Sequence, residues 1–430
     1  MTAEATTESP LAPPSAEEIV ALLPPGAHLD SDGSLVVAGC RVADVARMFG
    51  TPALLVDETA LRDQARRFRD GLASRWPDSR VLFASKAFPA TAVERIFAAE
   101  GLGCDIVGRG ELAIALRAGF DPASIYLHGN AKDDADIEAF AQAGGGTVVV
   151  DGFDDIDRLE RLGSQRQHVL VRVNPDIHAD TNEKMATGHA ASKFGLPIEQ
   201  ARTAIAKVEA SRRLHLAGLH VHVGSQIFDT EPFGRAVEQV ATLGTFEVYD
   251  VGGGLGVPYT TSERAPTVEE YLDTISNAAH ALLPAGAELV IEPGRALVAR
   301  AGLTVYTVVT VKRAGRAFVA VDGGMGDNLD PALYGQRYSP TVVDRVGGGQ
   351  LVDLVGRHCE SGDIIVPDTA LDDPRIGDVI VVPTTGAYAY TMQNNYNGAL
   401  RPPVVFLKDG EAREVIRRET IAELTRRDVE

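Results

Sequence analysis

The stretch Val81-Leu-Phe-Ala-Ser-Lys86 decides the fold, because it is an apolar, strand-like run that ends in a single lysine. Four more runs of this kind follow at steps of 22, 22, 22 and 21 residues, beginning at Gly103, Ile125, Thr147 and His168. Each gap holds a helical pattern, and the pattern at residues 111–119 closes on a helix-stopping glycine. Short buried strands that alternate with helices predict βα units and a parallel sheet.

Three further apolar runs, at residues 216–225, 246–254 and 288–295, raise the number of predicted strands to eight. Eight βα units predict an α/β protein with a closed (β/α)8 TIM barrel. Barrel chemistry takes place at the carboxyl ends of the strands, where a lysine such as Lys86 can form a Schiff base. A solvated charge at the rim is the alternative. Because Lys86 follows a buried run, desolvation is expected to lower its pKa and make the amine nucleophilic.

Length and charge set the class of protein. A chain of 430 residues is too long for one ordinary core, so two domains are expected. The net charge of −19 opposes nucleic-acid binding, which needs clustered cations. No apolar run reaches the roughly 20 residues that span a bilayer, and the first residues do not resemble a signal peptide, so we expect a cytoplasmic protein without a membrane partner. The cysteines fit no zinc spacing, and no metal site is predicted.

The sequence divides into four ranges. Residues 1–25 are expected to be disordered. Residues 26–48 contain a hairpin and a short helix, and we expect them to join the second domain. Residues 49–302 are assigned to the barrel. Residues 303–430 form short β-rich runs joined by Gly, Pro and Asp turns, which predicts a mostly antiparallel β domain.

Five motifs offer chemistry, each with a plain structural alternative. His220 and His222 alternate with valines and share one face of a strand, as lumen residues or as a plate against a planar ligand, and Gly224-Ser225 lets a ligand approach. The run 252–254 is three glycines, which form an anion cradle or a flexible loop. Glu292 and Arg295 either pair with each other or bind a pyridine nitrogen and an anion. The segments 359–363 and 386–388 are equally consistent with simple packing.

Together the motifs FASKA, HVGSQ, GGG, EPGR, CESGD and GAY are far more specific, because they occur in this order between residues 83 and 388. With this set the chain resembles the fold-type III pyridoxal-phosphate decarboxylases, which have an alanine-racemase-like barrel, and is most similar to the diaminopimelate decarboxylases among them. Further likenesses are at residues 127–130, 186–189, 192–195, 322–325 and 394–397.

The resemblance implies a cofactor, pyridoxal 5'-phosphate, and a role for each matching residue. Lys86 would hold the cofactor, His222 would stack on its ring and Glu292 would face its pyridine nitrogen. The phosphate and its surroundings would be contacted by Ser225, Gly252, Gly253, Gly254, Gly294, Arg295 and Tyr388. Substrate contacts would come from Arg295, Asp330, Tyr334, Glu360 and Tyr388. Cys359 would protonate the α-carbon, and with Glu360 it would reach into the neighbouring site of a homodimer with shared active sites.

One residue departs from the family pattern. The family usually has an arginine at the position of Asp330, and that arginine binds the distal carboxylate of the substrate. A carboxylate cannot do this. Either Arg337 or Lys184 supplies the missing cation, or the substrate carries a distal ammonium group, which the Asp330 carboxylate beside Glu360 would suit. Residues 179–183 also differ from the family, which commonly has histidines there.

The resemblance therefore implies a carboxy-lyase of lysine biosynthesis that converts meso-diaminopimelate to L-lysine and CO2. The alternative is a specialised paralogue that decarboxylates another diamino acid or a substituted D-amino acid. A non-catalytic binding protein of the same fold is disfavoured, because Lys86 and Glu292 are both present. A racemase is disfavoured by Glu292 and by the segment 359–363.

Overall fold

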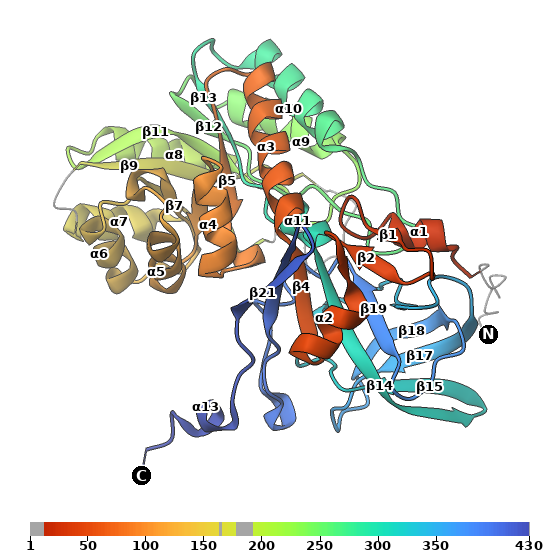
Figure 1. The fold of residues 1–430 in the computed structure, drawn as a ribbon. Coiled ribbons are helices and arrows are strands. Elements are labelled where there is room, and N and C mark those ends of the chain that lie inside the picture. The colour runs from red at the N-terminus through yellow and green to blue at the C-terminus, as the bar shows by residue number, and fades with distance from the viewer. Residues whose placement is uncertain (1–12, 163–165, 178–191, 430) are drawn as a thin grey trace, which may run out of the picture.

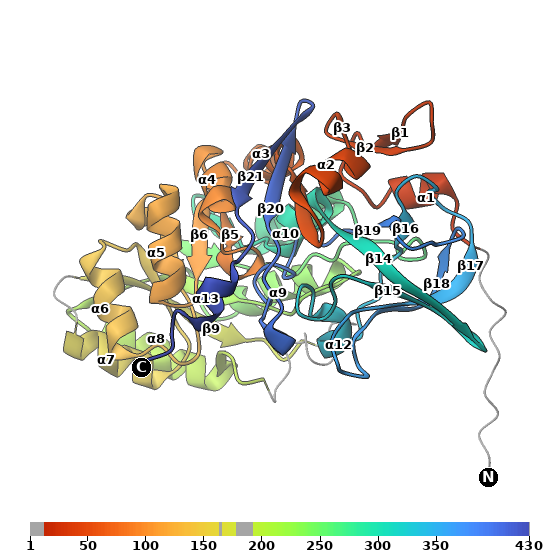
Figure 2. The same cartoon turned by 60° about the horizontal axis from the view of Figure 1, so that its bottom comes forward.

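The structure is a computed structural model that describes residues 13–162, 166–177 and 192–429. Its two parts lie side by side, with a barrel on the left and a β-rich part on the right of both views (Figures 1 and 2). The differing residues 179–183, the likeness at 186–189 and Lys184 lie outside the described residues.

Eight parallel strands close the barrel, as the sequence predicts. Their spatial order is β9-β11-β12-β13-β5-β6-β7-β8, and β8 pairs with β9 to complete the ring. The strands are β5 (Ser79–Ala84), β6 (Gly103–Ile106), β7 (Ile125–Leu127), β8 (Thr147–Val150), β9 (Gln167–Asn174), β11 (Leu214–Val221), β12 (Val248–Asp250) and β13 (Glu288–Ile291). A short strand, β10 (Leu196–Pro197), adds to the outside of β9.

Helices surround the barrel because each has an apolar stripe that packs against the strands. They are α3 (Glu58–Arg75), α4 (Thr91–Ala99), α5 (Arg109–Ala118), α6 (Asp134–Gln142), α7 (Phe153–Leu162), α8 (Ile198–Glu209), α9 (Glu231–Ala241) and α10 (Val268–Leu282). Helix α5 ends at Gly119, whose φ of 101° requires glycine, as its pattern predicts. Across the described ranges, no helix combines the length and apolar character needed to cross a membrane.

The second sheet is mostly antiparallel, as expected. Its strands include β14 (Gly302–Ala314), β15 (Arg316–Val321), β16 (Thr341–Val342), β17 (Gln350–Val355), β18 (Ile364–Leu371), β19 (Val379–Pro383), β20 (Val404–Lys408) and β21 (Glu411–Ile416). The pairs β15–β17 and β20–β4 are parallel. Strand β4 (Ala53–Asp57) lies between β14 and β20, so this part of the expected barrel range 49–302 belongs to the second sheet.

The N-terminal segment packs on this second sheet. Strands β1 (His28–Leu29), β2 (Leu35–Val37) and β3 (Cys40–Arg41) form a small sheet, and helix α2 (Val42–Phe49) follows it. Their apolar side chains share a core with residues of β14, β19 and β20. The expected disorder of residues 1–25 does not hold for helix α1 (Ala16–Val20), because a capping box at Ser15 begins it and Ile19 is fully buried. Residues 1–12 lie outside the described ranges.

Candidate active site

Polar side chains meet at the carboxyl ends of the barrel strands and line a cavity of about 400 Å3. This is the end of a TIM barrel at which active sites are built. The floor and wall of the cavity include Lys86 after β5, Asp105 on β6, His128 after β7, Arg172 on β9, His220 and His222 on or after β11, and Glu292 after β13. The sequence prediction for Lys86, His222 and Glu292 is therefore consistent with one common site.

Lys86 lies in a single 3-10 turn, Ser85–Ala87, directly after β5. Its side chain reaches the open cavity, whose lining also includes the buried carboxyl groups of Asp105 and Glu292. Burial acts to lower the pKa of Lys86, but Asp105, Tyr388 and Glu292 outweigh it, and the pKa is raised from its ordinary value. The expectation of a lowered pKa is wrong, because it counted desolvation and missed the carboxylates on neighbouring strands.

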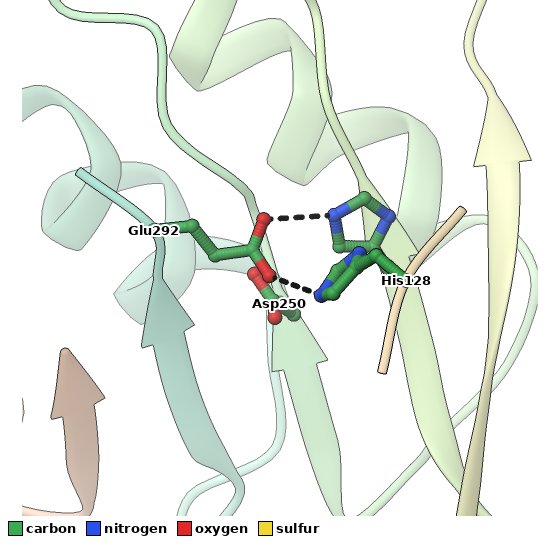
Figure 3. A group of neighbouring side chains, drawn as sticks. His128, Asp250 and Glu292 are labelled. Atoms are coloured by element: carbon green, nitrogen blue, oxygen red, sulfur yellow. Dashed lines mark hydrogen bonds and ion pairs between the residues drawn. The ribbon is translucent and has the colours of Figure 1, made fainter. Parts of the chain in front are cut away.

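Glu292 lies within a buried group of four polar side chains (Figure 3). His128 Nε2 is 2.7 Å from Glu292 Oε1, and His220 Nε2 is 3.2 Å from Glu292 Oε2. The fourth member is Asp250, at the end of β12, and one polar atom from each residue lies within 4.8 Å of the others. These atoms could contact a cation only by giving up their contacts with each other.

The two carboxyl groups of this set have opposite pKa shifts. Burial raises the pKa of Glu292, but His128 and His220 outweigh burial, and the pKa lies well below its usual range. The pKa of Asp250 is raised well above its ordinary value by burial and then by the charge of Glu292. Two carboxyl groups this close cannot both ionise at little cost. We therefore assign the charge to Glu292 and the proton to Asp250.

His222 presents a neutral ring to the cavity. Its Nδ1 accepts a hydrogen bond from the backbone N–H of Gly253 at 3.1 Å, which leaves the ring proton on Nε2. Burial lowers the pKa of His222 well below its usual range, and the cations Lys86 and Arg172 lower it further. A flat, uncharged ring on the cavity wall suits stacking on a planar ligand.

The glycine run 252–254 is required by close packing. A Cβ on Gly252 would lie 2.7 Å from the carbonyl oxygen of Val221, and Gly252 has a φ of 68°. A Cβ on Gly253 would lie 2.2 Å from the carbonyl oxygen of Glu292, and one on Gly254 would lie 2.4 Å from that of Gly224. Only glycine allows this turn between the ends of β11 and β13. Gly254 lines the cavity, whereas Gly252 and Gly253 lie behind its wall.

A second group of residues surrounds Arg295, the first residue of the short helix α11 (Arg295–Val298). Its guanidinium donates to Ser225 Oγ at 3.3 Å and to the hydroxyl of Tyr259, and it lies 4.7 Å from the ring centre of Tyr388. Burial lowers the pKa of Arg295, but Tyr259, Tyr388 and Asp330 outweigh it and raise the pKa. Ser225, Gly294, Arg295, Tyr334 and Tyr388 all line the cavity.

Asp330 does not line the cavity. It begins helix α12 (Asp330–Tyr334), is only 3% exposed, and accepts a hydrogen bond from the hydroxyl of Tyr338 at 3.4 Å. Burial raises its pKa to about 6, although the charge of Arg295 opposes the rise. Arg337, one predicted source of the missing cation, is exposed and donates to the carbonyl of Pro367 at 2.8 Å, outside the cavity lining.

Cys359 and Glu360 also lie outside this cavity. Both side chains are exposed or nearly so, and the backbone N–H of Cys359 donates to Asn397 Oδ1 at 2.9 Å. Glu360 accepts a hydrogen bond from the Tyr396 hydroxyl at 3.4 Å. Their predicted place in the site of a second copy stays a prediction.

Sequence reasoning missed part of the cavity floor. Asp105, Arg172 and Asp250 were not predicted, and His128 and His220 were seen within motifs but were given no role. A signal was present, because Asp105, Arg172 and Asp250 are charged residues near the carboxyl ends of otherwise apolar strands. In a barrel this position faces the ligand side, so a charge there predicts chemistry or ion pairing.

The donor set fits pyridoxal phosphate. An amine and an ionised carboxylate share the cavity, a flat neutral ring lies on its wall, and a guanidinium stands beside a turn that tolerates no side chains. These groups match an aldehyde, a pyridine nitrogen, an aromatic ring and a phosphate. The fold and the site together define a pyridoxal-dependent barrel enzyme.

Comparison with known proteins agrees with this class. A family model described as pyridoxal-dependent decarboxylase, pyridoxal binding domain, matches residues 59–299. The diaminopimelate decarboxylase of Actinosynnema pretiosum is 44% identical over 95% of each chain, and that of Mycobacterium tuberculosis is 40% identical over 92% of this chain and 95% of its own. The crystal structure of diaminopimelate decarboxylase from M. jannaschii with L-lysine has a TM-score of 0.88 at 29% identity, covering 95% of this chain and 98% of its own. The chain belongs to the diaminopimelate decarboxylase family of pyridoxal-dependent decarboxylases.

Proposed function

We propose that this chain removes the α-carboxylate of meso-diaminopimelate as CO2 and releases L-lysine, with pyridoxal phosphate bound to Lys86. In the net reaction the bond between the α-carbon and its carboxylate breaks, and a proton takes the place of CO2. The observation that carries this proposal is that Lys86 and an ionised Glu292 line one cavity with Arg295. The names and bound lysine of the similar proteins support the substrate.

Each group of residues has its part in holding the cofactor. Lys86 would anchor it, His222 would lie against its ring, and Glu292 would contact its pyridine nitrogen. Gly254, Ser225, Gly294, Arg295 and Tyr388 would surround its phosphate, with Gly252 and Gly253 behind them in the turn. When bound, the cofactor supplies an electron sink for the charge left at the α-carbon.

The protein's own contribution is electrostatic. An ionised Glu292 would keep the pyridine nitrogen of the cofactor protonated. The contact would become more stabilising in the transition state, when negative charge moves towards that nitrogen. Arg295 offers a buried cation for an anionic group, because its guanidinium is fixed by the hydroxyls of Tyr259 and Ser225.

Because Asp330 replaces an arginine of the family, the charge of the distal group of the substrate has to be argued from the cavity lining. A distal ammonium group would suit a carboxylate in the cavity, but Asp330 is buried outside the lining. Lys193 does line the cavity, and among the described residues its ammonium group contacts the ring of Phe194, at 4.9 Å, and no carboxylate. This arrangement favours a distal carboxylate over a distal amine.

The proposed working unit is a homodimer. Cys359 and Glu360 are exposed beyond the cavity of their own chain, which is compatible with insertion into a second copy. In that position Glu360 would contact the substrate together with Tyr334 of the chain that holds the cavity, and Cys359 would deliver the proton to the α-carbon. Equilibrium sedimentation and mixing of Lys86→Ala with Cys359→Ala protein test this, because shared sites predict that activity returns in the mixed dimer.

The decisive experiment combines absorption with turnover. Protein supplied with pyridoxal phosphate should show a visible absorption band that Lys86→Ala lacks, and CO2 release should be measured on meso-diaminopimelate, lysine, ornithine and D-amino acids. Turnover of meso-diaminopimelate supports the proposal. Retention of the band in Lys86→Ala refutes the anchor, and turnover of a distal amine without turnover of meso-diaminopimelate refutes the substrate. In that second case Asp330→Arg should gain activity on meso-diaminopimelate.

A further inference from the structure

We propose that His128 and His220 are positioning residues that hold Glu292 as an ionised, correctly oriented carboxylate, while Asp250 stores the compensating proton. The inference rests on the proposed function, because it concerns how Glu292 is prepared to face a pyridine nitrogen. It assigns work to three residues, His128, His220 and Asp250, for which the sequence offered none.

The position of His220 sets its protonation state. Its ring is 1% exposed, and Nδ1 is buried with no hydrogen-bond partner within the described part of the chain. A proton on that nitrogen would be left unsatisfied at a cost, so the single ring proton belongs on Nε2. From Nε2 it is donated to Glu292 Oε2, 3.2 Å away. Burial lowers the pKa of His220 to about 4, in agreement with a neutral ring that donates.

His128 contacts the other carboxylate oxygen. Its Nε2 lies 2.7 Å from Glu292 Oε1 and 3.6 Å from Asp105 Oδ1, an ion-pair contact in which neither Nε2 nor Oε1 has a hydrogen bond of good geometry among the described residues. A nitrogen between two carboxylate oxygens carries a proton, because a bare lone pair would be repelled by both. The rings of His128 and His220 meet edge to face, with centres 5.0 Å apart and an angle of 73° between planes. Each imidazole therefore limits the rotation of the other, and Figure 3 shows His128 pointing at Glu292.

Asp250 completes the charge balance. Its Oδ1 accepts a hydrogen bond from the N–H of Gly252 at 2.9 Å, and its Oδ2 is buried without a hydrogen-bond partner of ideal geometry in the described residues. Strand β12 fixes the place of Asp250 between its two neighbouring strands. The Cα of Asp250 lies opposite that of His220 on β11 and that of Val290 on β13. Ionising both Asp250 and Glu292 would place two like charges in one dry pocket. A proton on Asp250 avoids this and leaves Glu292 free to act.

Other charged groups face the same cluster and must be counted. Lys86 and Arg172 are the cations, Asp105 is the third carboxyl group, and the hydroxyl of Tyr271 lies beneath Asp250 and Glu292. Asp105 is shared between Lys86 and His128, so it does not replace the imidazole contacts of Glu292. The two histidines are thus the nearest groups that favour ionised Glu292.

The test reads the protonation of the ring nitrogen directly. Protein is loaded with pyridoxal phosphate labelled with nitrogen-15 in the ring, and the nitrogen chemical shift is measured with kcat and KM. We expect the wild type to show a protonated nitrogen. In His220→Leu and His128→Leu the signal should move towards the unprotonated value, and kcat should fall about ten- to a hundredfold with little change in KM, since one contact to a charged group is lost.

Matched variants separate positioning from simple packing. His220→Gln keeps an N–H donor near the Nε2 position and should recover much of the protonated signal, whereas the shorter His220→Asn should not. Asp250→Asn removes the stored proton but no charge, so the nitrogen should stay protonated. His215→Gln is the control, because His215 lies at the other end of the same strand, β11. It pairs with Glu247 at 3.0 Å and meets the ring of His168 edge to face, with ring centres 4.8 Å apart. It should change neither signal nor rate.

Each outcome decides the inference. A nitrogen that remains protonated in His220→Leu and His128→Leu, with kcat unchanged, overturns it. If the leucine variants do not fold, the comparison of His220→Gln with His220→Asn decides in the same way. A loss of the protonated signal in Asp250→Asn shows that Asp250 holds the charge and overturns the assignment. Failure of the wild type to bind the cofactor is a different result, because it refutes the proposed function itself.

Discussion

Replacing Glu94 by glutamine should stabilise the protein, although it removes a hydrogen-bonded acid. Glu94 lies in the first turn of α4, is fully buried, and accepts a 2.6 Å hydrogen bond from Ser85, the residue before Lys86. The other carboxylate oxygen of Glu94 is buried without a hydrogen-bond partner among the described residues. Glu94 also forms no ion pair with any of these residues. Burial raises its pKa to about 8, and the nearby Glu111 adds to the rise.

The sign and size follow from proton binding. Below the ordinary pKa of 4.5 both folded and unfolded chains are protonated, so the acid costs nothing. Between 4.5 and about 8 the folded chain binds one more proton, and the free energy of unfolding falls as the pH rises. At about 1.4 kcal/mol per pH unit, the cost is roughly 3 kcal/mol at neutral pH and about 5 kcal/mol above pH 8. Glutamine keeps a partner for Ser85 and removes this cost.

Urea unfolding of wild type and Glu94→Gln at several pH values measures the effect. The gain from the variant should vanish near pH 4 and grow up to about pH 8. Glu100, at the other end of the same helix, is the matched control, because it is also nearly buried but pairs with Arg62 at 3.0 Å and Arg66 at 2.8 Å. Its pKa is lowered by these arginines against the effect of burial, so Glu100→Gln should destabilise at neutral pH and lose its effect in acid. Equal stability of wild type and Glu94→Gln at every pH would refute the reasoning.

Two further substitutions test the packing that supports the site. Lys132 is buried and donates to the carbonyls of Gly129 and Val149 and to Asp155 at 2.8 Å. Lys132→Met should therefore lower the free energy of unfolding by about 3 to 5 kcal/mol. A urea midpoint equal to that of the wild type would contradict this. Gly253→Ala places a Cβ 2.2 Å from a backbone oxygen and should abolish cofactor binding in an absorption titration. The control is Gly110→Ala in α5, which has open space around the new Cβ and should bind the cofactor normally. Tight cofactor binding by Gly253→Ala would show that the turn can move.

The barrel was predictable because periodicity alone specifies it. Eight apolar runs, the first five at nearly constant steps, leave few alternatives, since parallel strands need helical crossovers and eight units close a ring. Strand β4 was harder, because its five buried residues are separated from β14 and β20 by more than 200 residues of sequence. Pairing over such a separation leaves no local signal.

The site was predictable where a residue type has a specialised chemistry and not where it acts through a neighbour. Lys86, Glu292 and Arg295 stand at strand ends in distinctive motifs, whereas the effect of Asp105 on Lys86 depends on the register of β5 and β6. Ser85 and Glu94 form a buried contact that no pattern announces. Direction errors in pKa have this origin, because the sequence reports the burial of a residue more readily than the charges opposite it.

The second domain is part of the active site and not an appendage. Tyr388 has a φ of 64°, a conformation that costs a non-glycine residue about 1 to 2 kcal/mol, and its N–H donates to the carbonyl of Ala87 in the turn that carries Lys86. Its ring then lies 4.7 Å from the guanidinium of Arg295. Just before it, a Cβ on Gly386 would lie 1.9 Å from the carbonyl of Val298, so the two domains meet backbone to backbone. The strain at Tyr388 is held by that junction, and the geometry of the cavity around Arg295 therefore depends on how the β domain docks.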